Sequence, residues 1–148
     1  MLTELTPQEC VDFVNSASLG HLACAQEGQP YSVPVRFACE YPYLYSFSMP
    51  GQKIEWMRAN PQVCLSVLEL KSDHDWRSVI VTGRFEELPD TPELHTTHHH
   101  AWTLLQSRPN WWEPGAIKPD TTPGTTSVAP VFYRIHMAHL TGRRSSPS

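Results

Sequence analysis

The feature that most limits the possible folds is a series of short apolar runs, each ended by a turn. Residues 19–25, 31–39 and 43–47 form such runs, and the segments between them, 27–30 and 40–42, contain glycine or proline. Apolar runs of this length, bounded by glycine and proline, are typical of β-strands joined by short connections. The sequence therefore predicts a three-stranded antiparallel meander here.

Three further runs extend this pattern. Residues 62–70 and 76–87 predict two more strands, and residues 131–140 predict a closing strand. Gly83 interrupts the 76–87 run and indicates a bulge or a barrel corner. Six mostly antiparallel strands with short connections predict a mainly β fold, a small β-barrel decorated by helices.

Three segments have helical features. Thr6-Pro7-Gln8-Glu9 combines an N-cap, a helix-opening proline and a capping-box glutamate, which predicts a helix over residues 7–17. Residues 53–59 have helical composition and stop at Asn60-Pro61, because the residue before a proline disfavours the helical conformation. Residues 92–106 predict a third helix.

The length of 148 residues predicts a single domain over residues 1–148. Residues 107–130 hold five prolines together with Trp111-Trp112, so we expect an irregular excursion there. Trp111 and Trp112 either cover a ligand or pack in the core or a subunit interface. Residues 142–148 are expected to form a loose polar tail.

The charges argue against two classes of partner. The formal net charge is −4 and the 11 Lys and Arg residues are scattered, so we expect no nucleic-acid partner. No apolar run approaches the roughly 20 residues that a membrane-spanning helix needs, so we expect no membrane partner. The first Lys or Arg is Arg36, which does not fit a signal or transit peptide. These features predict a cytoplasmic protein.

The four cysteines lack C-x-x-C spacing, and each lies among apolar residues: Cys10, Cys24, Cys39 and Cys64. A reduced thiol in such surroundings behaves as a small hydrophobic side chain. We therefore expect neither a disulfide framework nor a zinc site.

Basic side chains at strand and helix ends are candidates for anion binding. Lys53 follows the Pro50-Gly51 turn at a helix start, where phosphate is often held, although a solvated surface lysine is the alternative. Arg36 lies within an apolar strand and either faces solvent or pairs with an anion such as phosphate. Trp76-Arg77-Ser78 offers a ring plane, a guanidinium and a hydroxyl to a ligand, or anchors the barrel through its tryptophan.

Taken in order along the chain, several segments resemble a known family. They are similar to the FMN-binding split barrel of the pyridoxamine 5'-phosphate oxidase-related proteins, in the nitroimidazole-reductase-like, flavin-nucleotide-binding branch. The resemblance covers residues 5–143 and is most specific over residues 30–61. The segments are Gly20-His21-Leu22-Ala23, Pro30-Tyr31-Ser32-Val33-Pro34-Val35-Arg36-Phe37, Leu44-Tyr45-Ser46-Phe47-Ser48, Gly51-Gln52-Lys53, Asn60-Pro61-Gln62-Val63, Trp76-Arg77-Ser78-Val79, Tyr133-Arg134-Ile135 and Thr141-Gly142-Arg143.

The resemblance implies a flavoprotein whose FMN lies between the two subunits of a homodimer. It implies that the second strand runs along the flavin ring and that the end of the third strand holds the ring and ribityl chain. The lysine after the turn would hold the phosphate, and the start of the fifth strand would add polar contacts. The implied FMN-binding residues are Ser32, Val33, Pro34, Val35, Arg36, Ser46, Phe47, Ser48, Gln52, Lys53, Trp76, Arg77 and Ser78.

Two departures from the family pattern bear on the substrate. Tyr45-Ser46 stands where many relatives carry a histidine before the serine. Arg134-Ile135-His136 reproduces only loosely the C-terminal arginine and histidine pair that pyridoxine phosphate oxidases use for their substrate. We therefore expect an FMN-dependent oxidoreductase that acts on a small molecule and is not a vitamin B6 oxidase, with no catalytic side chain identified.

Other interpretations stay open beside this one. The same motifs fit a flavin-binding module without turnover. The histidines of residues 95–100 have helical spacing that could place two on one metal ion, but no complete ligand set stands near them, so we expect no metal site. A barrel that binds haem or a deazaflavin is a further alternative, with these histidines or His136 and His139 as haem ligands.

Overall fold

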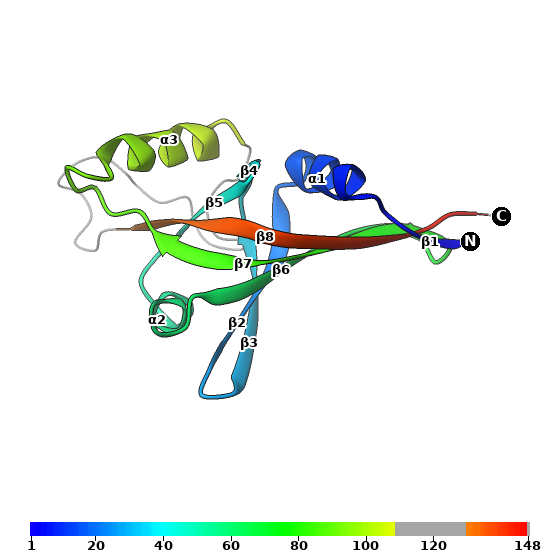
Figure 1. Cartoon of the computed structure of the whole chain (residues 1–148), viewed down its shortest axis with the longest axis horizontal. Coiled ribbons are helices and arrows are strands. Elements are labelled where there is room, and N and C mark those ends of the chain that lie inside the picture. The colour runs from blue at the N-terminus through cyan, green and yellow to red at the C-terminus, as the bar shows by residue number, and fades with distance from the viewer. Residues whose placement is uncertain (109–129, 148) are drawn as a thin grey trace.

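The computed structural model describes residues 1–108 and 130–147. Within these residues, eight strands form one antiparallel sheet and three helices lie against it (Figure 1). The elements are β1 (Leu2–Glu4), α1 (Pro7–Ser16), β2 (Leu19–Gln26), β3 (Gln29–Arg36), β4 (Ala38–Glu40), β5 (Tyr43–Ser48), α2 (Gln52–Ala59), β6 (Gln62–Ser72), β7 (Asp75–Glu87), α3 (His95–Gln106) and β8 (Val131–Ser145).

Two hairpins shape the sheet, whose strand order is β3-β2-β6-β7-β8-β5-β4. β2 and β3 are joined by the two-residue turn Glu27-Gly28, in which both residues have positive φ (50° and 79°), as a tight hairpin turn requires. β6 and β7 form a longer hairpin, and β8 pairs with β7 along the whole length of β7. β1 pairs with the last residues of β8, so both ends of the chain lie beside the tip of this hairpin (Figure 1).

The sheet curls so that β3 and β5 approach each other without pairing as strands. Ser46 Oγ on β5 donates a hydrogen bond to the Arg36 carbonyl at the end of β3, at 2.7 Å. The barrel is therefore split at this point. The mainly β, barrel-like fold that the sequence predicted is confirmed.

Two hydrophobic cores hold the layers together. The main core lies inside the curled sheet, where α1 and α2 cover it; its fully buried members include Val14, Leu22, Ile54, Leu65, Val79, Val81 and Tyr133. A smaller core lies between α3 and the sheet and includes Tyr45, Phe47, Leu88, Ala101, Leu105 and Phe132. β5 thus contributes to both cores from alternate positions, as a strand buried on both faces does.

Two predictions about the strands were wrong. The 31–39 run breaks after Arg36 into β3 and β4, and β5 pairs with β4 and β8 rather than continuing a meander. The segment predicted as a loose tail continues β8 to Ser145, because its backbone pairs with β1 and β7 even though Arg143 and Arg144 are polar. The composition of a segment does not show which distant strand it pairs with, so neither error could be avoided from the sequence.

Several local predictions are confirmed. The Thr6 hydroxyl accepts from the Glu9 N–H at 3.2 Å and the Glu9 carboxylate accepts from the Thr6 N–H at 2.9 Å, which completes the capping box of α1. The register of β7 against β8 shifts between Thr82 and Gly83, where a bulge was expected. α3 begins at His95, later than predicted, because a turn closed by the Leu94 N–H on the Thr91 carbonyl precedes it.

Most of the predicted irregular excursion, with Trp111 and Trp112, lies outside the described residues. Among the helices that the structure describes, none has the length and apolar character needed to cross a membrane.

Candidate functional site

β3 presents one backbone edge at the split. It stands at the end of the strand order, so that edge has no strand partner among the described residues. Ser32 and Pro34 are exposed on one face, whereas Val33 and Val35 turn toward the main core. The predicted stretch therefore offers a ligand mainly its unpaired backbone groups and its two outward side chains.

Arg36 ends β3 with an unsatisfied group. Its side chain is half-buried, and its Nε atom is buried without a hydrogen-bond partner among the described residues. Leaving a buried donor of a charged group without an acceptor costs free energy comparable to its lost hydration, so such atoms are uncommon unless a ligand completes them. Arg36 thus marks the split as a place where an acceptor fits.

The end of β5 lies on the other side of the split. Ser46 and Ser48 are buried polar residues, and their hydroxyls donate to the carbonyls of Arg36 and Met49 respectively. Phe47 points the other way, into the smaller core, where its ring meets that of Phe132 edge-on at 5.4 Å. Of the predicted β5 residues, Phe47 could therefore face the split only through its backbone.

α2 begins directly after this strand and carries Gln52 and Lys53. Its N-cap is Gly51, which makes no side-chain cap hydrogen bond, and the N-terminus of a helix is a place where anions are often held. Lys53 is half-buried and lies near β2: burial raises the pKa of the Cys24 thiol, and the positive charge of Lys53 opposes part of that rise. Gln52 is exposed beside it.

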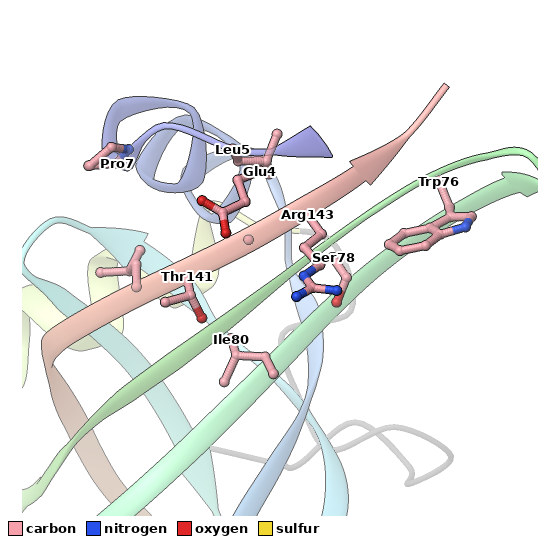
Figure 2. Close-up of a pocket in the computed structure, with 10 residues that line it drawn as sticks. Glu4, Leu5, Pro7, Trp76, Ser78, Ile80, Thr141 and Arg143 are labelled. Carbon is pink, nitrogen blue, oxygen red and sulfur yellow. The ribbon is translucent and has the colours of Figure 1, made fainter. Parts of the chain in front are cut away.

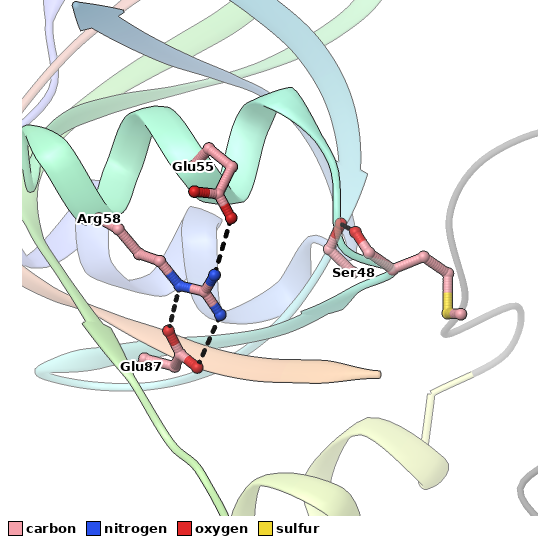
Figure 3. Close-up of polar contacts among 5 residues, drawn as sticks. Ser48, Glu55, Arg58 and Glu87 are labelled. Carbon is pink, nitrogen blue, oxygen red and sulfur yellow. Dashed lines mark hydrogen bonds and ion pairs between the residues drawn. The ribbon is translucent and has the colours of Figure 1, made fainter. Parts of the chain in front are cut away.

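Ion pairs fix the orientation of α2. The Arg58 guanidinium donates to both carboxylate oxygens of Glu87 on β7, at 2.7 and 3.1 Å, and to Glu55 at 2.8 Å (Figure 3). These bonds tie the last turn of α2 to the end of β7 and help to keep its first turn beside the split.

The third predicted group lies at the opposite end of the sheet. Trp76 and Ser78 stand near the start of β7, and Glu87, which binds Arg58 of α2, stands at its other end. The eleven residue steps from Trp76 to Glu87 span about 36 Å along the strand. One chain therefore does not bring Trp76 and Ser78 to Lys53.

Arg77 is engaged in local contacts on the other face of β7. Its guanidinium stacks over the Phe13 ring at 4.3 Å and pairs with Glu69 at 3.1 Å. Because neighbouring strand residues point to opposite faces, Arg77 points toward Phe13 of α1, whereas Trp76 and Ser78 point to the other face of β7.

A cavity of about 510 Å³, the terminal cavity, opens between β1, β7 and β8. Arg143 is the register partner of Ser78, and Figure 2 shows their side chains beside each other, with Trp76 next along β7. The sequence interpretation missed Arg143 as a site residue because it placed 142–148 in a loose tail. The cavity is lined by Glu4, Leu5, Pro7, Trp76, Ser78, Ile80, Leu140, Thr141, Gly142 and Arg143.

Three histidines of α3 lie close together: the ring centroids of His95 and His99 are 4.6 Å apart, and those of His98 and His99 are 6.4 Å apart. Three histidines of this helix hydrogen-bond to different partners. His95 Nδ1 lies 2.6 Å from the Asp90 carboxylate, His98 Nδ1 lies 2.8 Å from the Leu88 carbonyl oxygen, and His100 Nε2 lies 2.7 Å from the Glu40 carboxylate. The hydrogen bond from His95 lowers the pKa of Asp90. In the described parts of the chain, no three His, Cys, Asp or Glu side chains are placed to share a metal ion.

Comparison with known proteins extends over nearly the whole chain. Residues 6–144 match the family model for pyridoxamine 5'-phosphate oxidase. An uncharacterised protein of Rhizobium meliloti (strain 1021) is 46% identical over 139 residues, which cover 94% of this chain and 92% of that protein.

Solved structures agree with this match. An FAD-binding protein from Mesorhizobium loti is 40% identical with a TM-score of 0.79, and the alignment covers 99% of this chain and 98% of that one. A candidate 5-nitroimidazole antibiotic resistance protein from Bacteroides thetaiotaomicron shares the fold at 19% identity, with a TM-score of 0.67 over 97% and 89% of the two chains. Sequence and fold lead to one assignment: this chain belongs to the pyridoxamine 5'-phosphate oxidase family.

Proposed function

We propose that this protein binds a flavin nucleotide at the split and uses it as an oxidoreductase. The observation that carries the proposal is the buried Arg36 Nε, which has no hydrogen-bond partner among the described residues and lies at the split between β3 and β5. Such a place offers hydrogen-bond donors for ring carbonyls and a positive helix end for a phosphate.

The residues at the split fit the parts of a flavin. Lys53 and the first N–H groups of α2 would hold the phosphate, and the backbone of β3 would run along the ring. Arg36 Nε would donate to a ring carbonyl or to the phosphate, and Ser46 would line the ring and ribityl chain. The bound flavin would supply the electron transfer, so this scheme needs no acid or base side chain.

The proposed flavin nucleotide is either FMN or FAD. The sequence predicted FMN, and the Mesorhizobium loti relative is an FAD-binding protein. FAD contains the FMN half, so the split residues would serve either nucleotide. We therefore propose that the FMN half binds at the split, and direct competition between FMN and FAD identifies the physiological form.

A homodimer with two equivalent flavin sites is also proposed, because one chain separates the predicted residues. Trp76 and Ser78 of a second copy would reach the flavin nucleotide whose phosphate Lys53 of the first copy holds. An apolar strip on the same hairpin supports this arrangement: Leu68 and Leu70 are 61% and 62% exposed, and Leu70 is the register partner of Trp76. Exposed leucines on a sheet face are commonly covered by a partner surface.

The test of flavin binding is a titration of flavin-free protein with FMN and FAD, followed by visible absorption after removal of unbound ligand. We expect about one flavin per chain for the wild type. The Lys53→Ala variant should lose most of it, because the phosphate loses a charge-assisted bond worth a tenfold or larger factor in affinity (about 1.5–3 kcal/mol). Lys71→Ala, at an exposed position on β6, is the matched control.

Two results would count against the proposal. Full flavin retention by Lys53→Ala would refute the assignment of Lys53 to the phosphate. A wild-type protein that binds neither FMN nor FAD would refute the proposal that the cofactor is a flavin. Turnover is measured separately, as oxidation of NADH or NADPH with and without an electron acceptor. A flavin-loaded protein without turnover would leave a flavin-binding module.

A further inference from the structure

The terminal cavity lies away from the split of the same chain, so a flavin bound at that split would leave the cavity empty. It opens near the tip of the β6–β7 hairpin, whereas the split lies beside the other end of β7 (Figure 1). Its volume of about 510 Å³ falls in the range of small-ligand pockets. Trp76 and Ser78, which line it, are also the residues that a second copy would bring to the flavin.

The cavity combines a flat apolar part with a cation. The half-buried Trp76 indole lines one end of the cavity, and Ile80 and Leu140 line it farther along β7 and β8. The hydroxyls of Ser78 and Thr141 add hydrogen-bonding groups. The aromatic plane of Trp76 is suited to stacking on a heterocyclic base. The hydroxyls are suited to sugar or base edges.

Arg143 differs in its contacts from half of the eight arginines of this chain. Arg58, Arg77, Arg134 and Arg144 each pair with a carboxylate. Arg143 forms no ion pair within the described residues, although Glu4 is its register partner on β1 and also lines the cavity. A guanidinium available in a cavity is suited to a phosphate, and the nearby carboxylate favours a ligand with one phosphate there over a polyanion.

We propose that the terminal cavity holds the adenylate half of FAD whose flavin half is bound at the split of the second copy. Trp76 stacks on the adenine, Ser78 and Thr141 bond the sugar or base, and Arg143 pairs with the adenylate phosphate. Lys53 of the other copy then holds the phosphate on the flavin side. This inference rests on the proposed function and adds to it the residues that select FAD over FMN.

The test measures FMN and FAD affinities of flavin-free protein by fluorescence titration. We expect the wild type to bind FAD more tightly than FMN. Arg143→Gln should weaken FAD binding about tenfold or more and change FMN binding less than about twofold, because only FAD carries the second phosphate. Arg144→Gln is the matched control, since Arg144 faces α1 and pairs with Glu9. Its FAD affinity should stay that of the wild type.

Other outcomes separate this proposal from the proposed function. Equal losses of FMN and FAD affinity in Arg143→Gln, or no loss of either, would overturn the adenylate assignment and leave flavin binding intact. If the FMN-loaded protein binds NADPH and Arg143→Gln lowers its affinity for NADPH, the cavity would be assigned to the electron donor instead. A wild type that binds neither flavin would refute the proposed function and this inference together.

Discussion

At the scale of single residues, Arg36 offers a direct test of the split. Its buried Nε has no acceptor among the described residues, so the guanidinium should contribute little to the stability of the flavin-free protein. We expect Arg36→Met to keep the Tm of the flavin-free protein at or above that of the wild type. The same variant should lose most of the rise in Tm that flavin produces, measured by thermal unfolding with and without ligand.

The control is Arg84→Met, an exposed arginine on β7, which should change neither quantity. A flavin-free Arg36→Met protein that melts several degrees below the wild type would contradict the prediction. It would mean that the guanidinium already has a stabilising partner.

The raised pKa of the Cys39 thiol predicts how the free energy of unfolding changes at alkaline pH. Burial raises the pKa of its thiol from the ordinary 9.0 to about 11. The unfolded chain releases this proton near pH 9 while the folded chain keeps it, so the contribution to stability is complete below pH 9 and is lost as the pH rises toward 11. Denaturant unfolding of the wild type should show this fall.

Cys39→Ala isolates the contribution of this thiol, because the other groups that titrate in the same range are unchanged. Its free energy of unfolding should decline less steeply than that of the wild type between pH 9 and 11. Parallel declines in the two proteins would show that Cys39 ionises equally in both states.

At the scale of elements, the bulge in β7 depends on Gly83. A Cβ at this position would lie against the His136 carbonyl oxygen and 2.8 Å from Ile135 Cγ2, both on the paired strand β8. We expect Gly83→Ala to lower the free energy of unfolding by about 3 kcal/mol, the upper end of the usual cost of overpacking. Urea denaturation should show a lower midpoint at an unchanged m-value.

Gly51→Ala serves as the control for a glycine with space around it. Nothing lies within 4 Å of a Cβ built there, and its φ of 175° is open to any residue. Its stability should remain within about 0.5 kcal/mol of the wild type. Equal effects of the two substitutions would contradict the role given to Gly83.

At the scale of the whole molecule, the proposed dimer predicts complementation between two defective chains. Lys53→Ala removes one contribution to a site, and the double change Trp76→Ala with Ser78→Ala removes the other. Neither protein alone should bind flavin well. A mixed dimer keeps one intact site, because one copy supplies Lys53 and the other supplies Trp76 and Ser78.

Refolding the two variants together should restore flavin to about a quarter of the sites, since about half of the dimers are mixed and each has one intact site. Refolding Lys53→Ala with Gln52→Ala/Lys53→Ala is the control, and it should restore none, because both lesions lie at the same end. Failure of the first mixture to bind flavin would mean that the copies do not share their sites.

The sequence by itself determined the local structure and the family. The Thr6 capping box, the Glu27-Gly28 hairpin turn and the Gly83 bulge each depend on residues close together in the chain, and the order of short motifs carried the resemblance. Lys53 at the start of α2 belongs with them, because a turn followed by a helix start is a local feature.

Only the tertiary structure decided which of these residues share a place. Strand pairing joins segments far apart in sequence, so composition could not show that β5 pairs with β8 or that the polar stretch at Arg143 is a paired strand. Tertiary packing also decides what each face of β7 contacts. Arg77 stacks on Phe13 of α1, whereas Trp76 lines the terminal cavity with Arg143. Because β7 is long, the structure also separates Trp76 from Lys53, which the order of motifs along the chain could not reveal.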